Sequence, residues 1–380
     1  DDNLAFKLAA EDGHVEIVRF LLDQKESDVD NEYGYQHIDP AADDNYAIGM
    51  AAQNGHFEVV KFLLEKKEEN PGLYGDIDPA ADDNSAIRMA SRNGHIEVVK
   101  LLLRKKEELP ELYGDIDPAA DDNYALILAF ENGHVEVVKL LLEKKEKNPR
   151  LYGRIDPAAD GNYAIQFASY HGNVGMVKFL LEKRDEDPWL YRGIDPAADD
   201  NSAIRMAAQN GHVEVVKYLL AKKEENSRLY GGIDPAARNN HAILWASADG
   251  HVKIVELLLS KKEENPGLYG KIDPAAEDNY AVKAASRKGH FTVINLLLKK
   301  KEENPELYQG IDPAADDNLA IRLASQNGHI EVVRLLLAKR EEKSELYQRI
   351  DPAAWDNYAV WWASNNGHVE VVRLLLAKGE

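Results

Sequence analysis

Apolar positions along the chain follow two helical patterns that are separated by a glycine. Between Tyr46 and Gln53, small apolar residues fall on one side of a helix, which predicts a short first helix. Between His56 and Glu69, apolar residues recur at i, i+1, i+4 and i+5, which predicts a second, amphipathic helix. Gly55 lies between the two patterns and can adopt the left-handed backbone that ends a helix. The pattern therefore predicts a helix–turn–helix.

Polar residues mark the expected ends of these helices. We expect Asn45 to be the N-cap of the first helix, because its side chain can accept from backbone N–H groups of the first turn. The run Lys-Lys-Glu-Glu at 66–69 is expected to continue the second helix as a solvated turn. Pro71 then stops the helix, since proline cannot continue the hydrogen-bond ladder.

The same pattern recurs along the whole chain. The Gly-His dipeptide returns with a spacing of 39 residues from His56 onward, and one instance reads Gly172-Asn173. Such internal repetition predicts a quasi-linear array in which each repeat contacts mainly its neighbours. We expect a single continuous array over 1–380. Its ten repeats are approximately 1–38, 39–77, 78–116, 117–155, 156–194, 195–233, 234–272, 273–311, 312–350 and 351–380.

The segment from Tyr46 to Leu64 resembles an ankyrin repeat. It matches the family pattern at Ala51-Ala52, Gly55-His56, Val59-Val60 and Leu63-Leu64. The resemblance implies an all-α fold, an ankyrin-like α-solenoid of ten tandem helix-turn-helix units, in which first helices line a concave partner-binding face. The family's T-P-L-H tetrapeptide is absent, and each repeat is longer than the usual period of about 33 residues. The excess follows Leu63-Leu64, so we expect a longer second helix and a bulkier connector than the family's β-hairpin finger.

Composition excludes several classes of function. The chain has 46 Lys and Arg against 67 Asp and Glu, a net charge of −21, which argues against binding nucleic acid or anionic membranes. It has no Cys, which removes disulfides and thiolate metal sites. No signal segment or membrane-spanning run is visible, and the compartment stays open. No nucleotide-binding or hydrolase motif interrupts the repeats, so we predict no enzyme activity, no catalytic residue, no cofactor and no small-molecule substrate.

Two repeated polar features could suggest metal ions. The histidines are expected to lie a full repeat apart, too far to share one ion, and the resemblance implies that they bond backbone between repeats. The connector carboxylates Asp78, Asp82 and Asp83 are candidate calcium ligands, since oxygen donors suit that ion. The alternative is that they serve turns and helix starts, where a negative charge is favourable.

The residues four and eight positions after each repeat's Asn vary most, and this spacing places them on one face of the first helix. In the fourth and fifth repeats this face is richest in aromatic and aliphatic residues, which are typical of protein contacts. The alternative is neutral variation in a redundant array. The candidate partner-binding residues are Tyr124, Ile127, Phe130, Tyr163, Gln166 and Tyr170.

The two terminal repeats carry the same apolar pattern as the interior ones, whereas solenoids need polar terminal faces. Either flanking residues complete the array, or the ends meet other copies head to tail and form filaments. The candidate assembly residues are Leu4, Phe6, Phe20, Trp355, Trp361 and Trp362. We therefore expect a protein-interaction scaffold, with a self-assembling structural protein as the alternative; the partner is a protein or copies of the chain itself.

Overall fold

The computed structural model describes residues 2–26 and 38–378. They belong to two compact units. The N-terminal unit contains Asp1–Ala164 and Leu180–Ile194, and the C-terminal unit contains Ile165–Phe179 and Asp195–Glu380. The single continuous array over 1–380 stays a prediction.

The described residues form helices joined by turns, with no strand among them, which confirms the all-α prediction. The first helices of the repeats are α1 (Asp2–Glu11), α3 (Ala42–Gln53), α6 (Ala81–Arg92), α9 (Ala120–Glu131), α12 (Ala159–Tyr170), α14 (Ala198–Gln209), α17 (Ala237–Ala248), α20 (Ala276–Lys288), α22 (Ala315–Gln326) and α25 (Ala354–Asn365). The second helices are α2 (Val15–Glu26), α4 (Phe57–Glu69), α7 (Ile96–Glu108), α10 (Val135–Lys147), α13 (Val174–Glu186), α15 (Val213–Glu225), α18 (Val252–Glu264), α21 (Phe291–Glu303), α23 (Ile330–Glu342) and α26 (Val369–Lys378). Short connector helices, which the sequence pattern did not predict, are α5 (Pro71–Tyr74), α8 (Pro110–Tyr113), α11 (Pro149–Tyr152), α16 (Ser227–Tyr230), α19 (Pro266–Tyr269) and α24 (Ser344–Tyr347).

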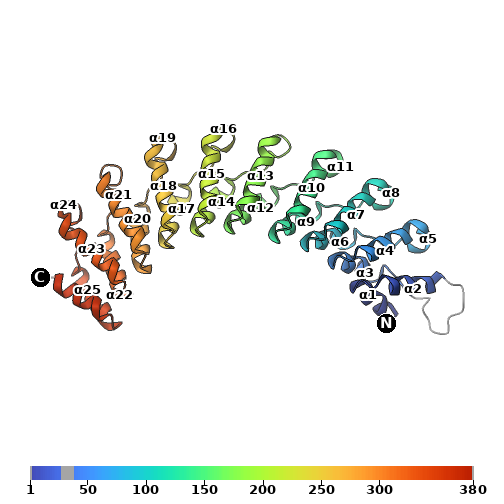
Figure 1. The fold of residues 1–380 in the computed structure, drawn as a ribbon, viewed down its shortest axis with the longest axis horizontal. Coiled ribbons are helices and arrows are strands. Elements are labelled where there is room, and N and C mark those ends of the chain that lie inside the picture. The colour runs from blue at the N-terminus through green and yellow to red at the C-terminus, as the bar shows by residue number, and fades with distance from the viewer. Residues whose placement is uncertain (1, 27–37, 379–380) are drawn as a thin grey trace. The chain divides into compact units, whose positions relative to one another are not determined.

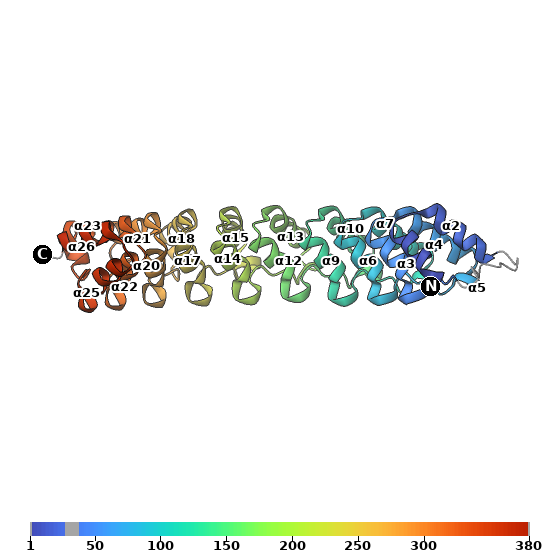
Figure 2. The same ribbon diagram turned by 90° about the horizontal axis from the view of Figure 1, so that it is seen from below.

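Within each unit the helices form two layers. In the N-terminal unit α1, α3, α6 and α9 pack side by side, and so do α14, α17, α20, α22 and α25 in the C-terminal unit. The second helices form the other layer (Figure 2). The short helices α5, α8 and α11 lie at the outer ends of the second helices (Figure 1). Small side chains such as Ala51 and Ala52, fully buried, allow the first helices to approach closely, while Val60 and Leu64 fill the space between layers.

The start of each interior first helix differs from the prediction. Asp43, Asp44 and Asn45 all have left-handed backbone angles, with φ of 54°, 53° and 63°. Asn45 does not cap its own helix; its Oδ1 accepts the backbone N–H of Asp78 in the next repeat at 2.7 Å. The equivalent asparagines accept the same bond from the next repeat: they are Asn84, Asn123, Asn201, Asn240, Asn279 and Asn318. The asparagine is therefore a link between repeats, since a buried polar group must find a partner.

The Lys-Lys-Glu-Glu run continues the second helix to Glu69, as expected, but its second lysine is buried rather than solvated. Lys145 is 5% exposed, and its ammonium donates to the carbonyl oxygens of Gly153 at 3.0 Å and Ile155 at 2.6 Å. Equivalent bonds hold the connectors at Lys67, Lys223 and Lys262. Burial lowers the pKa of Lys145, because it penalises the charged form. The other lysine of the pair, Lys144, reaches Glu107 of the preceding repeat at 2.7 Å.

Connector tyrosines complete the core. Tyr113 is 1% exposed, and its hydroxyl oxygen lies 3.0 Å from both the carbonyl oxygen of Leu64 and a carboxylate oxygen of Glu68, which share its one proton. Burial, followed by the bond to Glu68, raises the pKa of Tyr113 well above its ordinary value. Each such tyrosine reaches back to the preceding repeat's second helix, so the longer connector is a packed part of the fold.

The histidines bond backbone between repeats, as the resemblance implied. Nε2 of His251 lies 2.9 Å from the carbonyl oxygen of Gln209, and that of His329 lies 2.9 Å from the carbonyl oxygen of Arg287. A carbonyl only accepts, so Nε2 donates in both pairs. The ring also lies against the preceding repeat's turn glycine: a Cβ built on Gly55 would come within 2.5 Å of His95 Nδ1.

Candidate protein-binding surface

In the N-terminal unit, polar grooves lie between the first helices of neighbouring repeats, as between the second and third repeats and between the fourth and fifth. In several repeats the residue four positions after the repeat Asn faces the residue two positions before the next repeat's Asn, which is acidic in most repeats. Lys7, Arg88 and Lys283 form an ion pair there with the next repeat, whereas Arg322 packs on the rings of Trp355 and Tyr358 instead. Arg88 Nη1 lies 2.6 Å from Asp121 Oδ2, and Lys283 Nζ lies 3.5 Å from Asp316. The chain's own cation therefore closes these grooves.

The groove between the fourth and fifth repeats has Ile127 at this position. It encloses a cavity of about 560 Å³, lined by Asp121, Asp122, Asn123, Tyr124, Ile127, Glu131, Asp156, Ala159, Asp160 and Tyr163. The hydroxyl of Tyr163 donates to Glu131 at 2.6 Å, and this bond, with burial as a smaller cause, raises the pKa of Tyr163 to about 12. Asp160 is exposed, and no cation of the N-terminal unit's described residues pairs with it. The groove, which we call the Ile127 groove, is therefore acidic with an aromatic and aliphatic wall.

The structure brings together Tyr124, Ile127 and Tyr163 of the predicted partner-binding residues. Phe130 is 4% exposed and belongs to the core, and it does not line the groove, so it drops out of the predicted surface. Gln166 and Tyr170 lie in the C-terminal unit, where Tyr170 is 49% exposed.

Sequence reasoning missed Glu131 and Asp160 as site residues. Glu131 belongs to a column recognised as variable, and Asp160 belongs to the repeated acidic connector. One signal could have found them: Ile127 stands where other repeats have Lys7 or Arg88, while the nearby acidic positions keep their carboxylates.

The terminal repeats expose large apolar side chains. Leu4 is 50% exposed and Phe20 60%, whereas Phe6 is fully buried and is a core residue rather than part of an assembly surface. At the other end Trp355 and Trp361 are exposed and Trp362 is half-buried. The terminal repeats also expose four apolar residues that were not among the candidate assembly residues: Leu8, Ile17, Val369 and Leu376.

The connector carboxylates are used within the turns. Asp78 Oδ1 accepts the backbone N–H of Ala80 at 2.9 Å, while Asp82 and Asp83 occupy the left-handed turn. Across the described ranges, no three His, Asp or Glu side chains gather in a way that could hold a metal ion. Within residues 2–26 and 38–378, every helix is too short or too polar to span a bilayer.

Comparisons with known proteins give one family. The family model "Ankyrin repeats (3 copies)" matches residues 6–112, 109–191, 188–268, 205–309, 243–347 and 281–380. Among solved structures, the chain is similar to an ankyrin repeat family protein from Legionella pneumophila, with 20% identity, 88% of each chain covered and a TM-score of 0.27. No curated protein matches the sequence.

Proposed function

Because the chain belongs to the ankyrin repeat family, whose repeats are generally protein–protein interaction modules, we propose that it is a non-enzymatic scaffold. It binds a protein partner on the face formed by its first helices. Partner recognition of this kind needs no reacting group, only exposed anchors on a rigid support.

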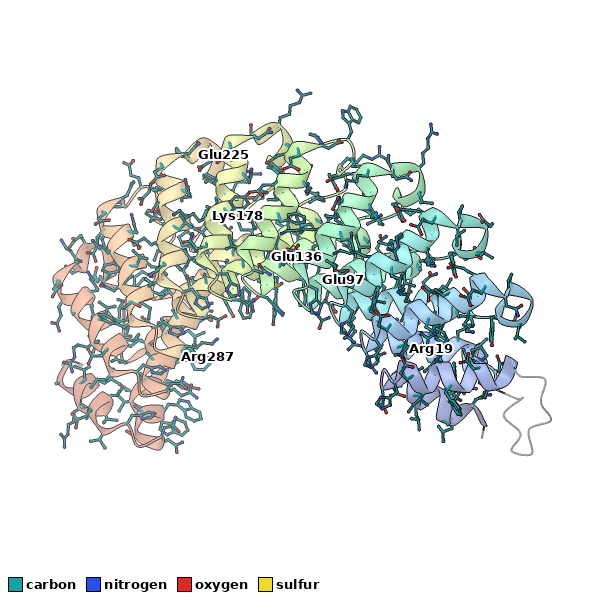
Figure 3. The ribbon with its side chains drawn as sticks, turned by 45° about the vertical axis from the view of Figure 1, so that its right-hand side comes forward. Arg19, Glu97, Glu136, Lys178, Glu225 and Arg287 are labelled. Carbon is teal, nitrogen blue, oxygen red and sulfur yellow. The ribbon has the colours of Figure 1, made fainter. Side chains whose placement is uncertain are left out.

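One observation supports this face over the opposite one. Among the described residues of the interior repeats, the exposed large side chains of the first helices are Tyr46, Tyr124 and Tyr170, which are 38%, 39% and 49% exposed. Tyrosine is enriched at protein interfaces, because its ring is large and rigid and its hydroxyl can form hydrogen bonds with water or with a partner. The interior second helices expose charged side chains such as Glu97 and Glu136 near their starts (Figure 3), and one exposed aromatic side chain among their described residues, Phe291, which is 38% exposed.

Site-specific photocrosslinking tests the proposal. A benzophenone amino acid replaces Tyr124 or Tyr170 on the first-helix face, and Glu97 or Glu136 on the other face as matched exposed controls. Crosslinking is carried out in an extract of the source cells, and the captured proteins are compared between positions by mass spectrometry. We expect one protein to be captured from both tyrosine positions and from neither glutamate position. Equal capture from all four positions would refute the assignment of the face.

A second function, end-to-end self-assembly, has its own supporting observation. Leu4, Leu8, Ile17 and Phe20 of the first repeat are each 47–60% exposed, and Trp355, Trp361, Val369 and Leu376 of the last are each 55–60% exposed. In interior repeats, the corresponding faces are covered by a neighbouring repeat. Light scattering over a concentration series tests this function: growth in mass with concentration, abolished by Phe20→Glu, supports it, and a constant monomer mass contradicts it.

A further inference from the structure

We propose that the Ile127 groove binds a lysine or arginine side chain of the protein partner. The groove is formed by α9 and by residues 159–164 of α12, all within the N-terminal unit. This inference rests on the proposed function and adds the chemistry of the partner.

The groove between the first and second repeats shows how such a cation is held. Lys7 pairs there with Asp43 and lies 5.9 Å from the centroid of the Tyr46 ring. The hydroxyl of Tyr46 donates to Glu11 at 2.9 Å. A carboxylate, a tyrosine ring and a second carboxylate therefore surround one ammonium group, which gains both an ion pair and a cation–π contact.

The Ile127 groove repeats this arrangement without the cation. Asp160 occupies the position of Asp43, Tyr163 that of Tyr46, and Glu131 that of Glu11; Tyr163 donates to Glu131 just as Tyr46 donates to Glu11. Ile127 occupies the position of Lys7, and the cavity of about 560 Å³ lies beside it. The recognition groups are retained while the internal ligand is missing.

The neighbouring grooves do not offer the same site. Arg88 fills the groove of the third and fourth repeats, where it pairs with Asp121 and lies 5.9 Å from the Tyr124 ring. The groove of the second and third repeats also lacks a cation on its N-terminal side, since it has Gly49 there, but Ser85 replaces the tyrosine and Arg88 donates to the carbonyl oxygen of Asp82 at 3.0 Å. Within the N-terminal unit, the combination of ring, carboxylates and open space thus occurs in the Ile127 groove.

A basic side chain suits this groove in both its charged and its apolar parts. The methylene stem of lysine or arginine can lie along Ile127 and the Tyr163 ring, while its charged end meets Asp160. The chain's net charge of −21 also favours encounter with a basic partner, because long-range attraction raises the association rate.

The test uses the full chain and a blocked Gly-Gly-Arg-Gly-Gly peptide as the probe. Its matched control is the same peptide with citrulline, which keeps the shape of arginine but has no charge. Methyl NMR of the Ile127 δ1 group reports where the probe binds, and ligand-observed saturation-transfer NMR reports the dissociation constant. We expect a saturable shift of the Ile127 methyl with the arginine peptide, and at least tenfold weaker binding of the citrulline peptide.

Three variants separate the proposal from general attraction to an acidic protein. Ile127→Lys supplies the internal cation and should weaken binding at least tenfold; Asp160→Asn, which keeps a residue tolerant of left-handed angles, should also weaken it. Lys7→Ile should open a second site of similar affinity in the first groove. Asp316→Asn removes a carboxylate from a groove that Lys283 already fills, so binding at Ile127 should not change.

Equal binding of the arginine and citrulline peptides would overturn the inference, as would unchanged binding to both Ile127→Lys and Asp160→Asn. If these results arise while photocrosslinks from Tyr124 and Tyr170 still identify a common partner, the basic-side-chain inference fails and the scaffold function stands. If the crosslinks identify no common partner while the arginine peptide binds as expected, the inference about the Ile127 groove is supported and the proposed partner-binding face is contradicted.

Discussion

The contact between each turn glycine and the next repeat's histidine can be tested at two glycines with nearly the same backbone. Gly55 has φ of +77° and Gly133 has φ of +72°. A Cβ at Gly55 would lie 2.5 Å from His95 Nδ1, whereas a Cβ at Gly133 would meet no described atom within 4 Å. The perturbation is Gly55→Ala, and Gly133→Ala is its matched control.

The structure separates two costs of these substitutions. Both alanines are held in a left-handed conformation, which costs about 1–2 kcal/mol. Only alanine at Gly55 also collides with the histidine ring, and overpacking of this kind costs about 1–3 kcal/mol. We therefore expect Gly55→Ala to lower the free energy of unfolding by about 2–5 kcal/mol, and Gly133→Ala by only about 1–2 kcal/mol.

Urea denaturation of the full chain, followed by far-ultraviolet circular dichroism, measures both losses, provided that the slope with urea is unchanged. The Gly55→Ala, His95→Asn double variant completes the cycle, since asparagine occurs naturally at the equivalent position Asn173. In the His95→Asn background, the cost of Gly55→Ala should fall to that of Gly133→Ala. Equal losses for the two single glycine variants would refute the reasoning, because the collision would then contribute nothing.

Three other substitutions test the links between and within repeats. Asn84→Ala removes the acceptor for the Asp117 backbone N–H at 2.7 Å and also holds alanine at a φ of 65°; it should cost about 2–5 kcal/mol of unfolding free energy, with faster hydrogen exchange at the Asp117 amide. Lys145→Met leaves two connector carbonyls without their donor and should cost a similar 1–3 kcal/mol or so by urea denaturation; no loss would show that this lysine is not structural. Burial, with repulsion from nearby arginines, lowers the pKa of His241 from 6.5 to about 4, so its neutral form is favoured in the folded state. Its contribution to the free energy of unfolding is present above pH 6.5 and is lost as the pH falls toward 4. Because the side chain is partly exposed to solvent, we expect this loss to be about 1–2 kcal/mol. His241→Tyr should remove the loss, which is measured as the difference in unfolding free energy between pH 7 and pH 4.5.

The helix pairs could be predicted because their signals are local. Val59, Val60, Leu63 and Leu64 repeat with the period of a helix, and Gly55 supplies the left-handed turn between helices. Every repeat carries the same signals in register, so a weak signal in one repeat is supported by the equivalent residues of the others. The histidine bonds to backbone could not be predicted from spacing alone, and came instead from the family resemblance.

The candidate surface was predicted only in part. Aromatic enrichment pointed to Tyr124 and Tyr163, which do line one groove. It also pointed to Phe130, which is buried, because a residue's place on a helix does not reveal what the neighbouring layer covers. Asp160 and Glu131 were missed because the sequence does not show that residues 29 positions apart face the same cavity.

By itself, the sequence determined the period, the pairs of helices and the apolar stripes, since each depends on residues a few positions apart. Only the tertiary structure decided the partners of the polar residues. Asn45 has the chemistry of a helix cap and Lys145 that of a solvated side chain, yet one bonds the next repeat and the other holds a buried connector. The physical reason is that a polar group bonds whatever burial leaves within its reach, and burial is set by the packing of whole repeats.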